Sequence, residues 1–263
     1  MNPEVIPISM VDLVISLVFI LAAGLVSVLH KLSLHKDLLI GTARTFIQLL
    51  IMGYALTFVF ELDSVLLVMG VYVVMIVFGA QIIHGRVKER EVNYLGPTFL
   101  SMLAGYFLIA YVVTGVVVGS DPWWKPQYFV PLAGMVIGNS MSALAISLER
   151  LFTDLRAKLR EVEMRLSLGA DYAEASHEIM ADALKAGMIP SINSMMGVGL
   201  VFIPGMTAGQ VLAGSDPLMA VRYQIVVMLM MVASTALSTV VVLRLVRRRC
   251  FGPSHRLLLS PSK

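Results

Sequence analysis

Charge is scarce in this chain of 263 residues, of which only 14% are Lys, Arg, Asp or Glu, against about a quarter in an ordinary soluble domain. Cysteine is scarcer still: Cys250 stands alone, which excludes an intrachain disulfide and a cysteine-based metal site. No GxxxxGK[ST] string occurs, so any nucleotide hydrolysis must come from another polypeptide. The chain is therefore predicted to be neither a soluble domain nor an enzyme in its own right.

Long apolar runs are what the sequence has in abundance, since 58% of its residues are hydrophobic. Seven stretches, each nearly free of charge, have the roughly 20 residues that a helix needs to cross a bilayer. They are Ser9–Leu29, Leu38–Phe60, Ser64–Ile83, Leu95–Val118, Phe129–Leu148, Met188–Leu212 and Val221–Leu243. Continuous runs of this length favour helices over a barrel of alternating strands. We predict an all-α membrane protein with seven transmembrane helices, forming one permease-like domain over residues 1–263.

The basic residues indicate the orientation of these helices. Of 20 Lys and Arg residues, 17 lie in every second gap or in the tail, and the alternate gaps contain only Lys125. Basic loops remain in the cytoplasm. The N-terminus is therefore predicted outside and the C-terminus inside, which requires an odd number of spans. The net charge of +3 follows from this topology, so no nucleic-acid partner is expected.

One cytoplasmic gap is much longer than the others and covers residues 149–187. Its first part places apolar residues at spacings of three and four, one face of a helix: Leu151, Leu155, Leu159, Val162 and Leu166. Gly169 is expected to end this helix, and Asp171 with Glu174 resembles a capping box that starts a second one. The second helix is expected to reach Gly187, before Pro190 marks entry into the sixth span. The excursion is either a docking surface for a cytoplasmic partner or an ordinary amphipathic hairpin.

The sixth span is the least regular, because Gly and Pro interrupt it repeatedly between Pro190 and Gly214. Such breaks are tolerated in a membrane where neighbouring helices or a water-filled cavity satisfy the backbone. The fifth span carries Gly134, Gly138 and Ser142 at a spacing of four, which predicts a face for close helix packing.

Several strings resemble the FetB-type family of ABC permeases, which is associated with iron export in bacteria and aluminium tolerance in plants. The matching strings are RTFIQLLIMGYAL (44–56), PLAGMVIGNSM (131–141), LSLGA (166–170), ALKAGMIPSINS (183–194), VGLVFIPGMTAGQVLAGSDPLMAVRYQI (198–225) and TALS (235–238). They cover most of the chain in order. Phe202 departs from the pattern, since the family usually has a small polar residue there, and this leaves the choice of substrate open.

The resemblance implies a permease subunit of the bacterial plasma (inner) membrane that exports a metal ion, iron first. It implies a cytoplasmic ABC ATPase as partner, which holds the ATP-Mg, and a permease homodimer in the bilayer; this chain itself is expected to bind no cofactor. The segment after the first cytoplasmic helix resembles the EAA-type coupling segment of such permeases. The implied ATPase-coupling residues are Leu168, Gly169, Ala170, Asp171, Glu174, Ala175 and Glu178.

Polar and irregular positions inside the spans are the candidates for a translocation path or gate. They are Arg44, Gln48, Asn139, Asn193, Pro204, Gly205, Met206 and Gln210. Arg44 either extends to the headgroups or pairs inside the bundle with Gln48, one turn further on. The amides either bond between helices or line the path. No metal ligands can be assigned from the sequence.

Two other functions remain open at this point. An ion-coupled secondary transporter would need no ATPase, but ionisable groups deep in the spans are missing. An ABC permease for a non-metal amphipathic substrate is the other alternative, because the sixth and seventh spans are rich in Met, whose thioethers suit soft metals or flexible packing rather than ferric ion.

Overall fold

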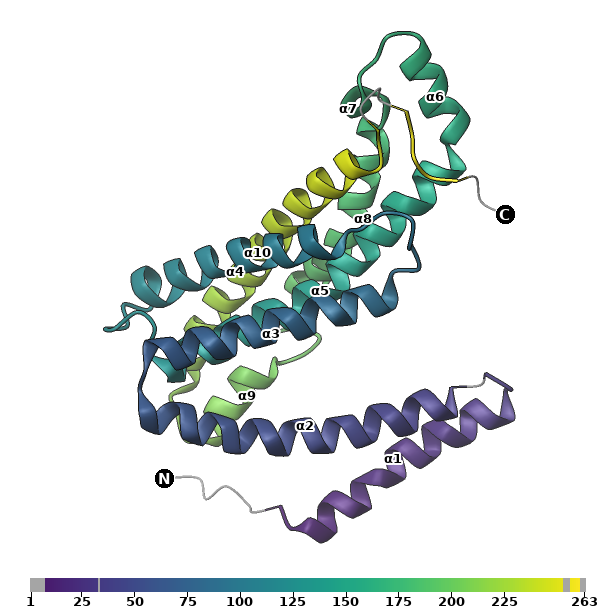
Figure 1. The fold of residues 1–263 in the computed structure, drawn as a ribbon. Helices are drawn as coiled ribbons and strands as arrows, with labels where there is room; N and C mark the ends of the chain where they lie inside the picture. Colours follow the sequence, from purple (N-terminus) through teal and green to yellow (C-terminus); the bar gives the residue numbers. More distant parts are fainter. Residues whose placement is uncertain (1–7, 33, 253–255, 261–263) are drawn as a thin grey trace. The chain divides into compact units, whose positions relative to one another are not determined.

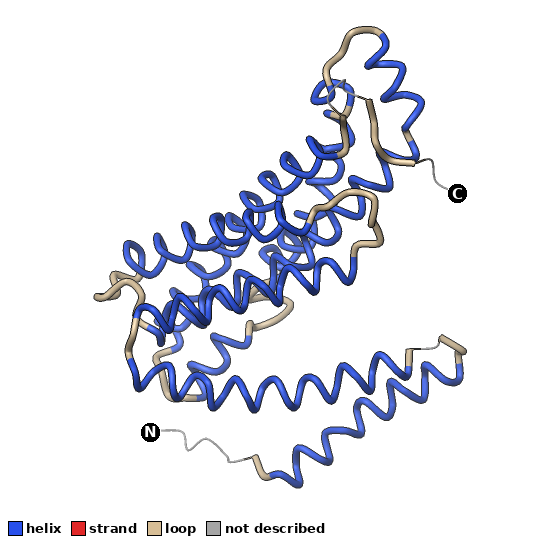
Figure 2. Tube along the Cα trace, in the orientation of Figure 1, coloured by secondary structure: helices blue, strands red, loops and turns tan. Residues whose placement is uncertain are grey.

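The computed structural model describes residues 8–32, 34–252 and 256–260, and every regular element within them is a helix (Figures 1 and 2). The chain divides into two compact units. Unit 1 contains residues 1–63 and 212–215, and unit 2 contains residues 64–211 and 216–263. The prediction of an all-α protein is confirmed.

Unit 1 is a helical hairpin of α1 (Met10–Leu29) and α2 (His35–Leu62). Ser9 starts α1 with a capping box, in which its hydroxyl accepts from the Asp12 amide and the Asp12 carboxylate accepts from the Ser9 amide. Most side chains of both helices are exposed, although they are strongly apolar. A helix that is apolar all round and exposed is expected to face lipid.

Unit 2 contains the remaining helices. They are α3 (Val65–Arg86), α4 (Leu95–Tyr111) with a π-helical extension η1 (Val112–Val117), α5 (Pro126–Ala157), α6 (Leu159–Ser167), α7 (Tyr172–Ala175), α8 (His177–Gly197), α9 (Gly205–Leu212) and α10 (Pro217–Arg249). The central helix is α5, which packs against α3, α8 and α10. Its buried face alternates large and small residues, with Phe129, Leu144 and Leu151 fully enclosed.

Close packing of α5 with α8 depends on Gly187. A Cβ added there would lie 2.7 Å from the carbonyl oxygen of Ala143 and would overlap the Ser147 hydroxyl. The predicted close-packing face is only partly present, because a Cβ at Gly134 would meet Met75 at 3.0 Å, whereas the space beside Gly138 is open. The closest approach therefore comes from a glycine that the spacing of four did not select.

The predicted sixth span, Met188–Leu212, is not one helix. The structure continues α8 through Gly187 and Pro190 to Gly197, then breaks, and α9 begins at Gly205. The expectation that a separate helix ends at Gly187 is wrong, because this glycine is held in the helix by its contact with α5. Six helices in the described chain are long and apolar enough to cross a membrane, so a seventh crossing and the orientation remain predictions.

Inside the break, residues 198–204 form a tight apolar loop. Gly199 adopts a φ of +83°, a left-handed conformation that favours glycine, and its amide donates to the carbonyl of Phe202 at 2.9 Å. Leu200 and Val201 project outward, with 92% and 84% of their surface exposed. Irregular backbone at membrane depth is tolerated only against protein or water.

Candidate functional site

The coupling segment predicted from the sequence folds as a compact helical turn. Leu168 ends α6, and Gly169 reverses the chain with a φ of +98°. Asp171 then caps α7, since its carboxylate accepts from the Glu174 amide at 2.7 Å and the Glu174 carboxylate accepts from the Asp171 amide at 3.0 Å. Both features were predicted, the glycine stop and the capping box, and both are confirmed. We call residues 168–175 the cytoplasmic turn, after the side of the membrane on which the sequence predicts them.

The cytoplasmic turn presents an apolar tip with an acidic flank. Leu168 is 81% exposed, and Asp171 and Glu174 are exposed beside it. Ala175 differs from the other predicted coupling residues because it is buried and faces the protein. Glu178, in the first turn of α8, pairs with Arg165 of α6 at 3.3 Å, which connects the two sides of the turn. The turn therefore exposes one large apolar side chain and two acids.

The opposite side of the cytoplasmic turn is fixed to the end of α10. The Arg247 guanidinium lies 5.7 Å from the ring centroid of Tyr172 and donates to the carbonyl of Ala173 at 3.4 Å. The Tyr172 ring also contacts the ring of Phe251, with 5.7 Å between their centroids. Movement of the turn is therefore expected to move the end of α10 with it.

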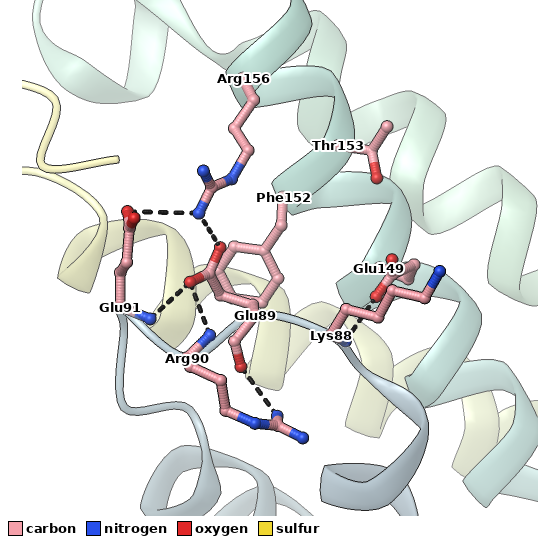
Figure 3. Close-up of a pocket in the computed structure, with 8 residues that line it drawn as sticks. All are labelled: Lys88, Glu89, Arg90, Glu91, Glu149, Phe152, Thr153 and Arg156. Atoms are coloured by element: carbon pink, nitrogen blue, oxygen red, sulfur yellow. Dashed lines mark hydrogen bonds and ion pairs between the residues drawn. The ribbon is translucent and has the colours of Figure 1, made fainter. Parts of the chain in front are cut away.

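A second charged cluster lies in the segment between α3 and α4 (Figure 3). Glu89 is almost fully enclosed, and one of its oxygens bonds the Arg156 guanidinium of α5 at 2.6 Å. Its other oxygen accepts from the amides of Arg90 and Glu91 at 2.7 and 2.6 Å. Arg156 also pairs with Glu91 at 3.2 Å. We call Glu89, Glu91 and Arg156 the Glu89 cluster; it lines a cavity of about 360 Å³.

The C-terminal segment closes over this cluster. The Ser260 amide donates to Glu91 at 3.0 Å, and the Ser260 carbonyl accepts from Arg156 at 2.8 Å. The hydrogen bond from the Ser260 amide, together with the Arg156 charge, lowers the pKa of the Glu91 carboxyl. Cys250 is fully buried beneath the same segment, and this burial raises the pKa of its thiol to about 12.

The candidate path residues in unit 2 lie in two places. The Asn139 side chain donates to the Ser191 hydroxyl at 3.2 Å, which joins α5 to α8 as an interhelical bond. Asn193 is exposed on α8, and Pro204 and Gly205 form the junction of the break with α9. Met206 and Gln210 line a cavity of about 200 Å³ between α5, α9 and α10. The Gln210 side-chain oxygen is buried there, with no hydrogen-bond partner in the described chain.

The cavity beside Gln210 is lined entirely by uncharged residues. Gln127, Tyr128, Pro131, Leu132, Met135 and Tyr223 complete its wall. Within the described ranges, no group of three or more His, Cys, Asp or Glu side chains is placed to hold a metal ion. The side chains of the cavity therefore offer only thioethers, amides and phenols as ligands for a metal ion. Nearby, Thr207 donates to Gln224 of α10 at 3.1 Å, which fixes α9 to α10.

Arg44 and Gln48 lie on α2 in unit 1, and both side chains are exposed. Neither makes an ion pair or a hydrogen bond to another side chain among the residues that the structure describes, so pairing of Arg44 with Gln48 is not observed. The sequence reasoning missed the Glu89 cluster. Its two main partners are separated by 67 residues, and no spacing in the sequence connects them.

Comparison with known proteins shows which protein family the chain matches. Residues 10–251 match the family described as "Uncharacterised protein family (UPF0014)". The chain is 37% identical over 228 residues to the UPF0014 membrane protein slr1647 of Synechocystis, covering 87% of this chain and 88% of the relative. It is 32% identical over 253 residues to the probable iron export permease protein FetB of Escherichia coli, covering 96% of each.

A plant protein is also similar. The protein ALUMINUM SENSITIVE 3 of Arabidopsis thaliana is 30% identical over 226 residues, covering 86% of this chain and 81% of the relative. No solved structure matches the chain. The relatives and the apolar helices together identify a multi-pass membrane transport permease.

Proposed function

Because the chain belongs to the uncharacterised protein family UPF0014, we propose that it is the membrane subunit of an ABC transporter that exports metal ions, iron first. ATP would be hydrolysed by a separate cytoplasmic ATPase that docks on the cytoplasmic turn. Two permeases and two ATPases would form the working unit in the bacterial plasma membrane. The iron assignment rests on the similarity to the probable iron export permease of Escherichia coli.

One structural observation carries the proposal: α8 joins the cytoplasmic turn to the helix break without interruption. It begins at His177, directly after the turn, and ends at Gly197, where the apolar loop starts. Its 21 residues correspond to about 30 Å of continuous helix, with Pro190 in its interior. A displacement of the turn by an ATPase would therefore be delivered as a shift or tilt at the break.

The fixed side of the turn supports the same mechanism. Arg247 and Phe251 hold Tyr172 against the C-terminal end of α10. Thr207 holds α9 against Gln224, near the N-terminal end of α10. The turn, α8, α9 and α10 thus form a connected frame around the break. Movement in such a frame changes the width of the cavity that Met206 and Gln210 line.

Docking is tested by ATPase measurements on the purified permease with its ATPase subunit. Ala170→Arg and Glu174→Arg place a bulky cation on the cytoplasmic turn. We expect either change to lower permease-stimulated ATP hydrolysis by about tenfold, the effect of losing about 1.4 kcal/mol of docking free energy. Glu163→Arg, on the exposed outer face of α6, is the matched control and should leave the rate unchanged. Unchanged rates and an intact complex for both turn variants would contradict docking at this surface.

A non-metal amphipathic substrate is the second candidate, and one observation favours it. The cavity at Gln210 is lined only by neutral side chains, among them Tyr128, Tyr223, Met135 and Met206. Hard cations prefer oxygen ligands that carry charge, whereas thioethers and aromatic rings suit soft or apolar ligands. ATPase stimulation of the reconstituted complex by Fe(II), Fe(III), Cu(I), Al(III) and neutral organic compounds separates the two. Stimulation by organic compounds alone would remove the metal assignment and keep the ATP-driven permease.

A further inference from the structure

A groove on the outside of unit 2 is separate from both the cytoplasmic turn and the cavity at Gln210. It has a volume of about 520 Å³ and is formed by the end of α3, one face of α5 and a wall from α8. Its lining residues are Arg86, Ser142, Ala145, Ile146, Glu149, Arg150, Thr153 and Ala186. We call it the Arg86–Arg150 groove.

The two guanidinium groups in this groove keep donors available. Arg150 uses its Nε to bond Asp154 at 2.7 Å, and this fixes the side chain while its terminal nitrogens have no partner in the described chain. Arg86 makes no ion pair among the same residues. Glu149 lies nearby, but one of its oxygens already accepts from the Lys88 amide at 3.0 Å (Figure 3).

The charges that face the groove therefore add up to a positive site. Arg86 and Arg150 contribute two positive charges, and Glu149, which already accepts a hydrogen bond, contributes one negative charge, so the lining carries a net charge of +1. Paired guanidinium donors bind the oxygens of phosphate groups strongly, because such bonds are charge-assisted and the fork geometry matches. The Thr153 hydroxyl adds a further donor at the same end.

The other end of the groove is apolar and extends into the predicted span. Arg150 and Thr153 lie just beyond Leu148, where the predicted span ends, whereas Ala145, Ile146 and Ser142 lie within it. The distance along α5 from Thr153 to Ser142 is about 16 Å, from a rise of 1.5 Å per residue. The groove thus changes from cationic to apolar at the depth where a phospholipid changes from headgroup to acyl chain.

We propose that the Arg86–Arg150 groove binds an anionic phospholipid, with its phosphate between the two guanidinium groups and an acyl chain along Ile146 and Ala186. Basic pockets between helices at the cytoplasmic side of a membrane are suited to anionic headgroups. A zwitterionic lipid would bring a choline or amine group to a site that is already positive. Free phosphate would leave the apolar half of the groove uncovered.

The test uses the full-length chain purified in detergent, with thermal unfolding followed as lipid is added. Phosphatidylglycerol should raise the midpoint temperature in a saturable manner, whereas phosphatidylcholine and inorganic phosphate at equal concentration should not. Equal stabilisation by phosphatidylcholine would overturn the charge argument. Equal stabilisation by inorganic phosphate would overturn the assignment to a lipid.

Variants tie the effect to the groove. The double change Arg86→Gln and Arg150→Gln should weaken phosphatidylglycerol binding about thirtyfold, since each basic residue at an anionic surface contributes roughly fivefold. Arg86→Lys with Arg150→Lys keeps the charge but removes the guanidinium forks, so it should weaken binding less than the double Gln change does, which distinguishes charge loss from misfolding. Arg160→Gln removes an exposed cation of α6 outside the groove and should leave the affinity unchanged. Unaltered binding by the double Gln variant would disprove the proposal.

Discussion

Among single residues, Glu89 shows how the fold encloses a carboxyl group while supplying it with hydrogen-bond donors. Two backbone amides and the Arg156 guanidinium donate hydrogen bonds to both carboxylate oxygens, and these bonds replace the ones that water would otherwise make. Because the Arg156 side chain is 22% exposed, its guanidinium could bond water if Glu89 were removed, whereas the two backbone amides would be left without an acceptor.

We expect Glu89→Ala to destabilise unit 2 by about 3 kcal/mol, the cost of breaking a buried ion pair and leaving its partners unsatisfied. The measurement is the free energy of unfolding in detergent, from a denaturant series. Glu163→Ala, an exposed acid of α6 without a side-chain partner in the described chain, is the matched control and should change it little. Equal, small effects for both variants would show that the cluster is not structural.

The pKa of Glu91 predicts a dependence on pH. The Ser260 amide and Arg156 lower the pKa of this carboxyl below its ordinary value of 4.5. A lowered pKa contributes stability that is present above the ordinary value and is lost as the pH falls through the lowered one. The midpoint temperature of the native chain should therefore exceed that of Glu91→Gln at pH 7, and the difference should shrink as the pH falls below 4.5 towards the lowered pKa. A difference that stays constant as the pH falls well below 4.5 would contradict this assignment.

At the level of helices, the sequence correctly predicted those features that depend only on residues close together in the chain. The Gly169 stop and the Asp171–Glu174 capping box act within one turn, and both are present as expected. The continuation of α8 past Gly187 and Pro190 was not predictable in this way, because it depends on contact with Ala143 and Ser147 in another helix. The Glu89 cluster was missed for the same reason, since its partners meet only after α3, α4 and α5 have packed.

Gly187→Ala should separate α5 from α8, because the added methyl group has no space beside the Ala143 carbonyl. Overpacking of this kind costs typically about 1–3 kcal/mol. Gly138→Ala, in open space on α5, is the matched control, and it should be neutral or slightly stabilising because alanine favours a helix. Both variants are compared by midpoint temperature in detergent. Similar midpoint temperatures would mean that α5 and α8 accommodate the added methyl group without loss of stability.

For the whole molecule, composition and the long apolar runs were enough to predict the fold class, and the resemblance of several strings to a known family predicted the family of transport proteins. They were not enough to count the crossings, because a break of a few residues inside an apolar run leaves its average hydropathy high. The Gly and Pro residues marked the sixth span as irregular, but where α8 ends and α9 begins depends on the hydrogen bonds around Gly199 and Phe202.

The orientation is tested by labelling with a membrane-impermeant maleimide in intact cells. The chain suits this experiment, because its single cysteine, Cys250, is buried and its thiol has a raised pKa. Asp121→Cys, expected outside, should label in intact cells, whereas Glu174→Cys, expected inside, should label only after permeabilisation. Labelling of Glu174→Cys from outside would reverse the topology and remove the docking proposal with it.

If α8 and α9 together form the seventh crossing that the sequence predicts, the short helix after the break has a consequence for the energetics of transport across the bilayer. With eight residues, α9 is about 12 Å long, less than half the roughly 30 Å of hydrocarbon. If solvent reaches the break from one face, the membrane voltage falls mainly over the thin layer that remains. Each unit of charge that leaves through this layer then experiences almost the whole potential, about 2.3 kcal/mol per 100 mV, in a single short step. The rate of that step should respond to voltage far more steeply than the rate of any earlier one.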